Sequence, residues 1–231
     1  MIIYGRNPVR EALAAGLRPV TRVWAAPQAA EEPWLRDREV EVTGPHELTD
    51  ICGSPDHQGV CAEAGPFPYA DPDTLLEADD ALLVCLDQVQ DPRNLGAVCR
   101  VAECVGASGV AIPERRAAEV SPAACKTSAG AVEHLPVARV RNVADFLTDA
   151  KQRGAWVYGA AAGAPVAYDE PDYRGRVVLV LGSEGRGLRP RVADACDQLV
   201  ALPVRGRVAS LNVSTAAAAL LYEILQSRRR G

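Results

Sequence analysis

The chain has 231 residues, of which 48% are hydrophobic and 24% are charged, a composition typical of a soluble globular protein with a sizeable core. No stretch of about 18 apolar residues occurs and the N-terminus shows no signal peptide, so we expect a cytoplasmic protein without a membrane partner. The formal net charge of −5 argues against a nucleic-acid partner, although the basic residues are almost all arginines and gather in a few clusters.

Cysteine and histidine usage limits the redox and metal chemistry that the chain can carry. Its seven cysteines form no C-x-x-C pair and most of them lie inside apolar runs, which is typical of buried free thiols in a reducing cytoplasm. Its three histidines show no spacing typical of metal ligands. We therefore expect no metal site.

The first 66 residues are predicted to form a small α/β unit. Apolar patterning and turn residues indicate helices at 6–15 and 47–52, and strands at 20–25, 40–42 and 59–64. The proline-rich segment 65–72 cannot easily continue regular structure and is typical of a linker. We therefore expect an accessory domain at 1–66, a linker at 67–79 and a second domain at 80–231.

From residue 81 onward, strand and helix patterns alternate. The sequence predicts strands at 81–86, 109–113, 136–140, 155–161, 177–181 and 199–202. Between and after them it predicts helices at 94–106, 121–128 and 143–153, and a long one from about 212. This alternation indicates an α/β domain whose sheet has five or six mostly parallel strands with helices on both faces.

Two polar loops in this second domain are candidates for a ligand site. The glycine-rich turn 182–187 follows an apolar strand, and the loop 203–211 carries Arg205 and Arg207 and leads into the final helix. In open α/β sheets, small ligands bind where such loops leave the carboxyl ends of the strands. The glycines alone would suit an ordinary tight turn as well. The G-x-G-x-x-G fingerprint of a nicotinamide cofactor is absent.

The helix at 94–106 carries a charge that needs an explanation. Asn94 is a good helix cap after Pro92, and Arg100 lies further along in an otherwise apolar segment. A charged side chain on a packed helix needs either a partner or a function. The sequence leaves two interpretations open: an ion pair with Glu103 or Asp87, or a role in chemistry.

Three segments together resemble the SpoU branch of the SPOUT methyltransferases, which use S-adenosylmethionine to methylate ribose 2′-hydroxyls in RNA. They are D-P-R-N-L-G-A-V-C-R (91–100), L-V-L-G-S-E-G-R-G-L (179–188) and L-P-V-R-G-R-V-A-S-L-N-V-S (202–214). A weaker similarity at 3–13 and 57–60 is to the N-terminal domain of bacterial 23S rRNA guanosine 2′-O-methyltransferases.

The resemblance implies a C-terminal trefoil knot, an exception to the rule that chains do not thread their own loops. It also implies a homodimer, and an N-terminal RNA-binding domain like those of certain ribosomal proteins. By position, S-adenosylmethionine would contact Gly182, Leu202 and Leu211. The residues around the reacting atoms would be Asn94, Arg100, Glu184, Ser210 and Asn212.

Other functions remain as alternatives to 23S rRNA ribose methylation. The transfer-RNA ribose methyltransferases share the same three motifs, and some knotted methyltransferases modify guanine ring nitrogens. A catalytically silent RNA-binding module and a nicotinamide-dependent oxidoreductase are less favoured, because every expected position of the methyltransferase motifs is filled.

Partner surfaces can also be predicted. The alanines 216–219 offer a small-residue surface for close helix packing in a homodimer, to which Leu220, Leu221, Ile224 and Leu225 add apolar area. For RNA phosphates, the best candidate in the N-terminal domain is its first 22 residues, which hold four arginines and one glutamate.

Overall fold

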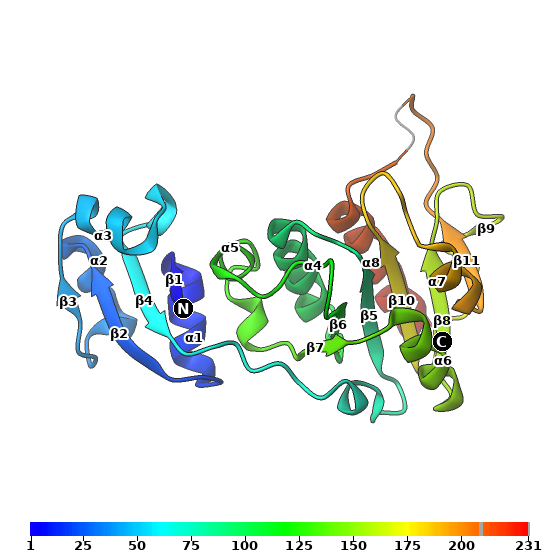
Figure 1. Ribbon diagram of the computed structural model, residues 1–231, viewed down its shortest axis with the longest axis horizontal. Coiled ribbons are helices and arrows are strands. Elements are labelled where there is room, and N and C mark those ends of the chain that lie inside the picture. The colour runs from blue at the N-terminus through cyan, green and yellow to red at the C-terminus, as the bar shows by residue number, and fades with distance from the viewer. Residues whose placement is uncertain (208–209, 231) are drawn as a thin grey trace.

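The computed structural model describes residues 1–207 and 210–230, which form two sheets (Figure 1). The N-terminal sheet has the order β1-β4-β2-β3, with β4 antiparallel to both of its neighbours. Its strands are β1 (Ile2–Tyr4), β2 (Val20–Ala25), β3 (Glu41–Val42) and β4 (Val60–Ala64). The helices of this unit are α1 (Arg6–Ala15), α2 (Pro27–Ala30) and α3 (Pro45–Cys52).

The second sheet has seven strands, all parallel, in the order β7-β6-β5-β10-β8-β11-β9. The strands are β5 (Leu82–Asp87), β6 (Gly109–Pro113), β7 (Val137–Val140), β8 (Trp156–Ala160), β9 (Val166–Ala167), β10 (Val177–Gly182) and β11 (Gln198–Ala201). The predicted parallel α/β sheet is confirmed, with a short edge strand, β9, that the sequence does not predict. The trefoil knot stays a prediction.

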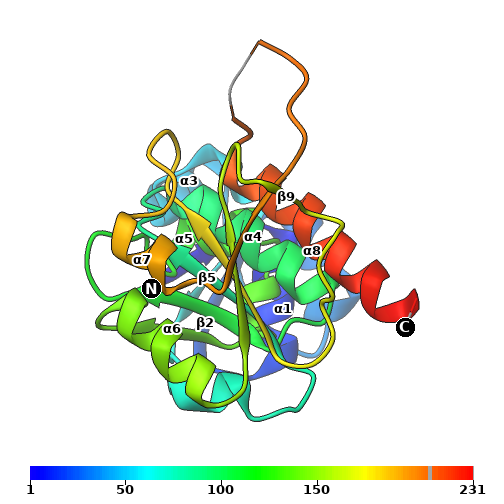
Figure 2. The ribbon, with the colours of Figure 1, turned by 90° about the vertical axis from the view of Figure 1, so that its right-hand side faces the viewer.

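Helices cover both faces of this sheet (Figure 2). They are α4 (Pro92–Cys104), α5 (Pro122–Thr127), α6 (Val143–Gln152), α7 (Pro190–Ala195) and α8 (Val213–Arg230). Successive residues of β5 point to opposite faces, so Val84 joins the core formed with α4 and α8 whereas Leu83 joins the core formed with α6 and α7. No helix in the described part of the chain is long and apolar enough to cross a membrane.

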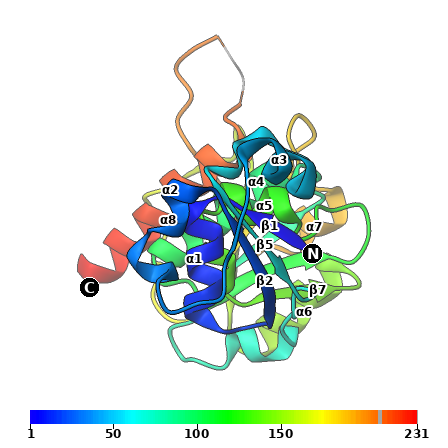
Figure 3. The ribbon, with the colours of Figure 1, turned by 90° about the vertical axis from the view of Figure 1, so that its left-hand side faces the viewer.

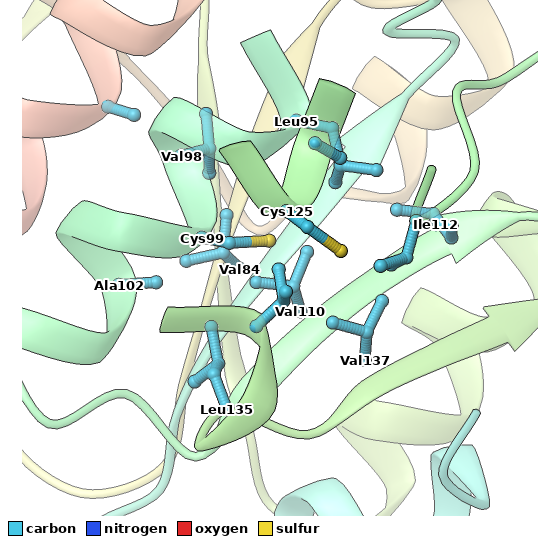
Figure 4. Close-up of a cluster of buried hydrophobic side chains, with 14 of the residues drawn as sticks. Val84, Leu95, Val98, Cys99, Ala102, Val110, Ile112, Cys125, Leu135 and Val137 are labelled. Atoms are coloured by element: carbon cyan, nitrogen blue, oxygen red, sulfur yellow. The ribbon is translucent and has the colours of Figure 1, made fainter. Parts of the chain in front are cut away.

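The core beneath α4 explains how closely that helix approaches its neighbours. Figure 4 shows Val98 and Cys99 of α4 packed over Val84 of β5, and both α4 side chains are fully buried. At Gly96 an added Cβ would lie 2.4 Å from the carbonyl oxygen of Ala124 in α5. A side chain at this position would therefore push α5 away from α4.

The predicted linker is packed rather than free. Phe67 is 9% exposed, and the 3₁₀ helix Pro72–Leu76 buries Leu75 and Leu76 against the sheet and α6. Ala70 also forms a bridge with Ala138 of β7. The prolines do end the regular structure of the N-terminal unit, but the segment after them belongs to the core of the C-terminal unit.

A buried ion pair joins the two units, which lie end to end (Figures 1 and 3). The side chains of Arg18 and Glu133 are both 1% exposed, and the Arg18 guanidinium binds Glu133 through Nε and Nη2. Its Nη1 also donates to the carbonyl oxygen of Gly65 at 3.1 Å. Burial lowers the pKa of Arg18, but the hydrogen bonds and charge of Glu133 outweigh this effect and raise it overall. The placement of Arg18 on an RNA-binding surface is therefore wrong.

We expect Arg18→Lys to lower the free energy of unfolding by about 2 kcal/mol, because an ammonium cannot reproduce the forked hydrogen bonds to a buried carboxylate. Urea denaturation would measure this loss. The matched control is Arg10→Lys, since Arg10 pairs with Glu11 at the surface, and there the change should be about 0.5 kcal/mol or less. Equal effects in the two variants would contradict a structural role for the buried pair.

Candidate active site

The three segments that resemble methyltransferase motifs meet at the carboxyl edge of the large sheet. The first leaves β5 and enters α4, the second leaves β10, and the third leaves β11 and enters α8. Because β5, β10, β8 and β11 are consecutive neighbours in the sheet, their loops emerge side by side. Figure 2 shows the loop after β10 in yellow and the loop before α8 in orange rising from this edge.

Side-chain hydrogen bonds join the three segments. The Nδ2 atoms of Asn94 and Asn212 each donate to Oε1 of Glu184 at 2.6 Å. Asn212 Nδ2 also lies 3.1 Å from Oδ1 of Asn94. Asn94 is only 9% exposed, so this amide needs its partner. The structure thus brings three of the predicted site residues into direct contact.

Asn212 is also the cap of the last helix. Its Oδ1 accepts hydrogen bonds from the backbone N of Ser214 at 2.8 Å and of Thr215 at 3.4 Å. A single side chain therefore satisfies the N-terminus of α8 with its oxygen and holds Glu184 with its amide nitrogen. This double role fixes the third segment relative to the second.

The loop after β10 closes on itself. The backbone N of Gly187 donates to the oxygen of Ser183 at 2.9 Å, and Gly185 and Gly187 have φ of 76° and 67°. A Cβ on Gly182 would lie 2.1 Å from the carbonyl carbon of Gly187. The backbone that requires a glycine at position 182 is therefore the loop's own, before any ligand is considered.

A buried carboxylate anchors the same loop, and the sequence does not reveal it. Asp87 is the register partner of Gly182 in the sheet, and its side chain is fully buried. It accepts hydrogen bonds from the backbone N of Arg189 at 2.9 Å and from Nε of Arg189 at 2.8 Å. Both ends of the glycine loop are thus fixed to the last residue of β5. In the sequence, the only local sign that Asp87 anchors the loop is that it is a polar residue at the end of a buried strand.

Arg100 does not have the environment that the sequence predicts. It is exposed on α4, because the buried side of that helix consists of Val98, Cys99 and Ala102. No ion pair joins Arg100 to another residue in 1–207 or 210–230, and Asp87 forms its ion pair with Arg189. The ion-pair interpretation is therefore not supported, and Arg100 lies apart from the Asn94–Glu184–Asn212 set.

A cavity of about 480 Å³ lies beside these residues, within the range of small-molecule sites. Its lining is largely apolar, and Glu184 and Ser210 add polar side chains to it. All three positions predicted to contact a cofactor line it, namely Gly182, Leu202 and Leu211. Further lining comes from Ala160, Leu181, Val200, Val204, Val213 and Leu220, among others.

The cysteines near the site are not suited to nucleophilic chemistry. All seven cysteines of the chain are free. Burial raises the pKa of Cys196 to about 12 and raises that of Cys85 still further, so both remain thiols at neutral pH. In the described part of the chain, no group of three or more His, Cys, Asp or Glu side chains could hold a metal ion.

Known proteins with similar sequences are RNA methyltransferases, in agreement with the three converging segments. The SpoU rRNA Methylase family profile matches residues 81–222, and a profile for RNA 2'-O ribose methyltransferase substrate binding matches residues 2–70. The putative TrmH family tRNA/rRNA methyltransferase YacO of Bacillus subtilis is 37% identical, over 98% of this chain and 95% of its own length. An uncharacterized tRNA/rRNA methyltransferase of Mycolicibacterium vanbaalenii is 40% identical, over 99% of this chain and 77% of its own length.

A solved structure adds the cofactor of a relative. The SpoU methyltransferase AviRb of Streptomyces viridochromogenes, crystallised in complex with AdoMet, is 26% identical. It superimposes with a TM-score of 0.83 over 100% of this chain and 91% of AviRb. The fold, the converging segments and the family profiles agree. This chain belongs to the SpoU rRNA methylase family and is an RNA 2′-O-ribose methyltransferase of the SpoU/TrmH type.

Proposed function

We propose that the chain transfers a methyl group from S-adenosylmethionine to the 2′-hydroxyl of a guanosine in 23S ribosomal RNA. The observation that carries the proposal is the hydrogen-bonded set Asn94, Glu184 and Asn212, which joins three distant segments beside the cavity. Ribosomal RNA is favoured because residues 3–13 and 57–60 resemble the N-terminal domain of the 23S rRNA enzymes. We propose residues 1–66 as that accessory domain, followed by 67–79 and a methyltransferase domain at 80–231.

The cavity suits S-adenosylmethionine. Leu202 and Leu211 offer apolar surface for the adenosine, and the backbone groups of 184–186 are available for its polar edges. The carboxylate of Glu184 in the lining is complementary to the positive charge of a sulfonium. The cofactor supplies the methyl group, carried on that sulfonium.

The residues around the cavity meet the demands of an in-line displacement. The acceptor oxygen must be aligned with the methyl group, so that the O–C bond forms as the S–C bond breaks and a neutral thioether leaves, and its proton must pass to solvent water. Asn94 and Asn212 hold Glu184 and its loop in one position, so the cavity keeps its shape while the RNA is placed. Ser210 lines the cavity, where its hydroxyl is available to the acceptor ribose. Arg100 does not line the cavity. In the homodimer proposed below, its positive charge would reach the developing alkoxide from the exposed side of α4 of the other subunit.

The test is direct. The purified chain is incubated with S-adenosylmethionine and unmodified 23S rRNA or tRNA transcripts, and ribose methylation is mapped by resistance to alkaline cleavage. We expect one resistant guanosine in 23S rRNA. When that nucleotide is a 2′-deoxyguanosine, which lacks the acceptor hydroxyl, no labelled methyl group should be transferred to the RNA from radiolabelled S-adenosylmethionine. Methylation of tRNA alone would move the function to tRNA, and a methyl group on guanine would replace ribose by base methylation. Cofactor binding without transfer to either RNA would favour the silent RNA-binding module.

We also propose a homodimer formed through α4 and α8, which pack on each other. The exposed stripe of α8 consists of Thr215, Ala219, Tyr222 and Gln226, and it ends at the exposed Arg229 and Arg230. Leu220, Leu221 and Ile224 are buried in the chain's own core, so their predicted contribution to a dimer surface is wrong. The surface left for a dimer contact consists of Tyr222, which is 49% exposed, the accessible alanines 216, 218 and 219, and the half-buried Leu225.

We expect light scattering to give the mass of a dimer at micromolar concentration, and Tyr222→Glu to give a monomer. A carboxylate placed in the centre of an apolar interface would be buried without a partner. Val42→Glu is the matched control, because Val42 is at least as exposed as Tyr222 but lies on β3 of the N-terminal sheet. A monomeric wild type, or a dimeric Tyr222→Glu variant, would contradict this interface. We also propose that the enzyme acts in the cytoplasm, as expected of an enzyme that methylates ribosomal RNA.

A further inference from the structure

We infer that RNA phosphates are held mainly by an arginine edge on the C-terminal unit rather than by the arginines of the first 22 residues. This inference rests on the proposed function and names the surface that would hold the RNA. The arginine edge consists of exposed arginines that follow four strands of the large sheet: Arg115 and Arg116 after β6, Arg141 after β7, Arg186 after β10, and Arg205 and Arg207 after β11. Arg189 and Arg191 also follow β10, but they pair with Asp87 and Asp145 and are not counted in it.

The topology places these arginines along one edge. All seven strands of the sheet are parallel, so every loop that follows a strand leaves from the carboxyl edge. β7 and β6 form one end of the sheet, and β10 and β11 lie on the other side of β5. An RNA backbone that follows the edge from Arg141 to Arg205 must cross the segment where Asn94, Glu184 and Asn212 meet. Arg186 itself lines the cavity.

Pairing separates these arginines from the four arginines of the first 22 residues. In the described residues 1–207 and 210–230, no ion pair involves any member of the arginine edge. By contrast, the four arginines near the N-terminus all have carboxylate partners. Arg6 pairs with Glu32, Arg10 with Glu11, Arg18 with Glu133 and Arg22 with Glu41.

A guanidinium without a partner binds phosphate at lower cost than a paired one. A paired arginine must first lose its carboxylate, and the remaining carboxylate then repels the phosphate. The loops of the arginine edge also carry local positive charge, although the chain has a net charge of −5. The segment 114–116 holds two arginines and one glutamate, and the segment 202–207 holds two arginines and no acidic residue. Phosphate binding is therefore favoured at this edge.

The experiment compares two triple variants of the full chain. In the edge variant Arg115, Arg116 and Arg141 are changed to Gln, because these three lie outside the cavity. In the matched variant Arg6, Arg10 and Arg22 are changed to Gln. Binding of an unmodified 23S rRNA transcript is measured by filter retention between about 50 and 200 mM salt, a range over which counterion release changes affinity steeply.

If each of the three arginines contacts one phosphate of single-stranded RNA, the plot of log affinity against log salt should become less steep by about 2 in the edge variant. Its affinity at 0.15 M salt should then fall on the order of 50-fold. The matched variant should change the slope by less than about 1. Both variants should keep wild-type affinity for S-adenosylmethionine in calorimetry, which shows that the fold is intact.

The inference is overturned if the salt dependence of RNA affinity becomes less steep in the matched variant, or if it changes in neither variant. Either result is distinct from a failure of the proposed function. If the wild-type chain methylates the transcript while the edge variant keeps its slope, only the placement of the RNA is wrong. If the wild-type chain transfers no methyl group to either RNA, the proposed function itself fails, whatever the slopes.

Discussion

Gly182→Ala should abolish measurable binding of S-adenosylmethionine. The added Cβ would lie 2.1 Å from the carbonyl carbon and 2.3 Å from the carbonyl oxygen of Gly187. These atoms belong to the backbone of the closed loop, so the contact cannot be relieved by turning a side chain. The loop must open, and the wall of the cavity that Gly182 to Gly187 provide opens with it. Calorimetric titration with the cofactor measures the loss.

Gly206→Ala is the matched control, since Gly206 lies in the second loop of the site. Among the described residues, no atom lies within 4 Å of a Cβ built at this position, and its φ is not in the left-handed region. We expect near wild-type affinity for this variant. Circular dichroism and a thermal melt establish that both variants are folded. Wild-type cofactor affinity in a folded Gly182→Ala chain would show that the closed loop is not the cofactor site.

Local patterns in the sequence predict most of the fold. The helix predicted at 6–15 matches α1, and the buried strands predicted at 81–86 and 109–113 match β5 and β6 within a residue. These elements have enough residues for their apolar patterning to be visible. β1 and β9 have three and two residues, too few for any pattern, and only hydrogen bonding to β4 and β11 defines them.

The packing between elements is what local patterns cannot predict. Prolines at 66, 68 and 72 indicate a break in regular structure, but they carry no information on what Phe67 and Leu75 pack against. Arg18 shows the same limit. The residues around it in the sequence are basic, and the carboxylate with which it pairs in the interior, that of Glu133, lies 115 residues away. A charge can be assigned to a surface only when its distant partners are known.

For the candidate site too, one part could be predicted from the sequence and another could not. Asn94 and Glu184 are 90 residues apart, and Asn94 and Asn212 are 118 apart, so only the resemblance to a family predicts that they belong together. The environment of Arg100 is where the sequence misleads. The apolar content of α4 predicts a helix packed on all sides, yet Ala97 and Val101 beside Arg100 are half-buried and Cys104 is exposed. Small apolar residues on an exposed helix face look the same as core residues in a sequence.

Arg100→Ala should keep cofactor binding and lose turnover by about 100-fold or more, the scale of one strong transition-state contact. The side chain is exposed and no carboxylate in the described chain neutralises it, so its charge is available to an RNA substrate. Single-turnover methylation at saturating 23S rRNA and cofactor measures the loss. Glu103→Ala is the control, because Glu103 is an exposed charge on the same helix. Near-normal turnover in Arg100→Ala would remove this residue from the mechanism.

Arg100→Lys distinguishes two roles for the side chain. Arginine holds its proton so firmly that it is a poor general base, whereas a guanidinium readily grips a phosphate and stabilises a developing alkoxide. If the role is electrostatic, Lys keeps the charge but loses the forked geometry, so part of the activity should remain and the pH profile should be unchanged. If Arg100 accepts the proton, the lysine variant should show a shifted pH profile, since the proton affinities of the two side chains differ.

The geometry of α4 sets the place where Arg100 acts. Six residues separate it from Asn94, which corresponds to about 9 Å along the helix axis and a rotation of about 240°. Asn94 points toward Glu184, so Arg100 points away from that set, on the side where α4 and α8 are exposed. In the proposed dimer this side faces the partner subunit. A mixed dimer of one Arg100→Ala chain and one Asn94→Ala chain should then regain activity, because one of its two sites has both residues intact. If mixed dimers are as inactive as the parents, Arg100 acts within its own chain.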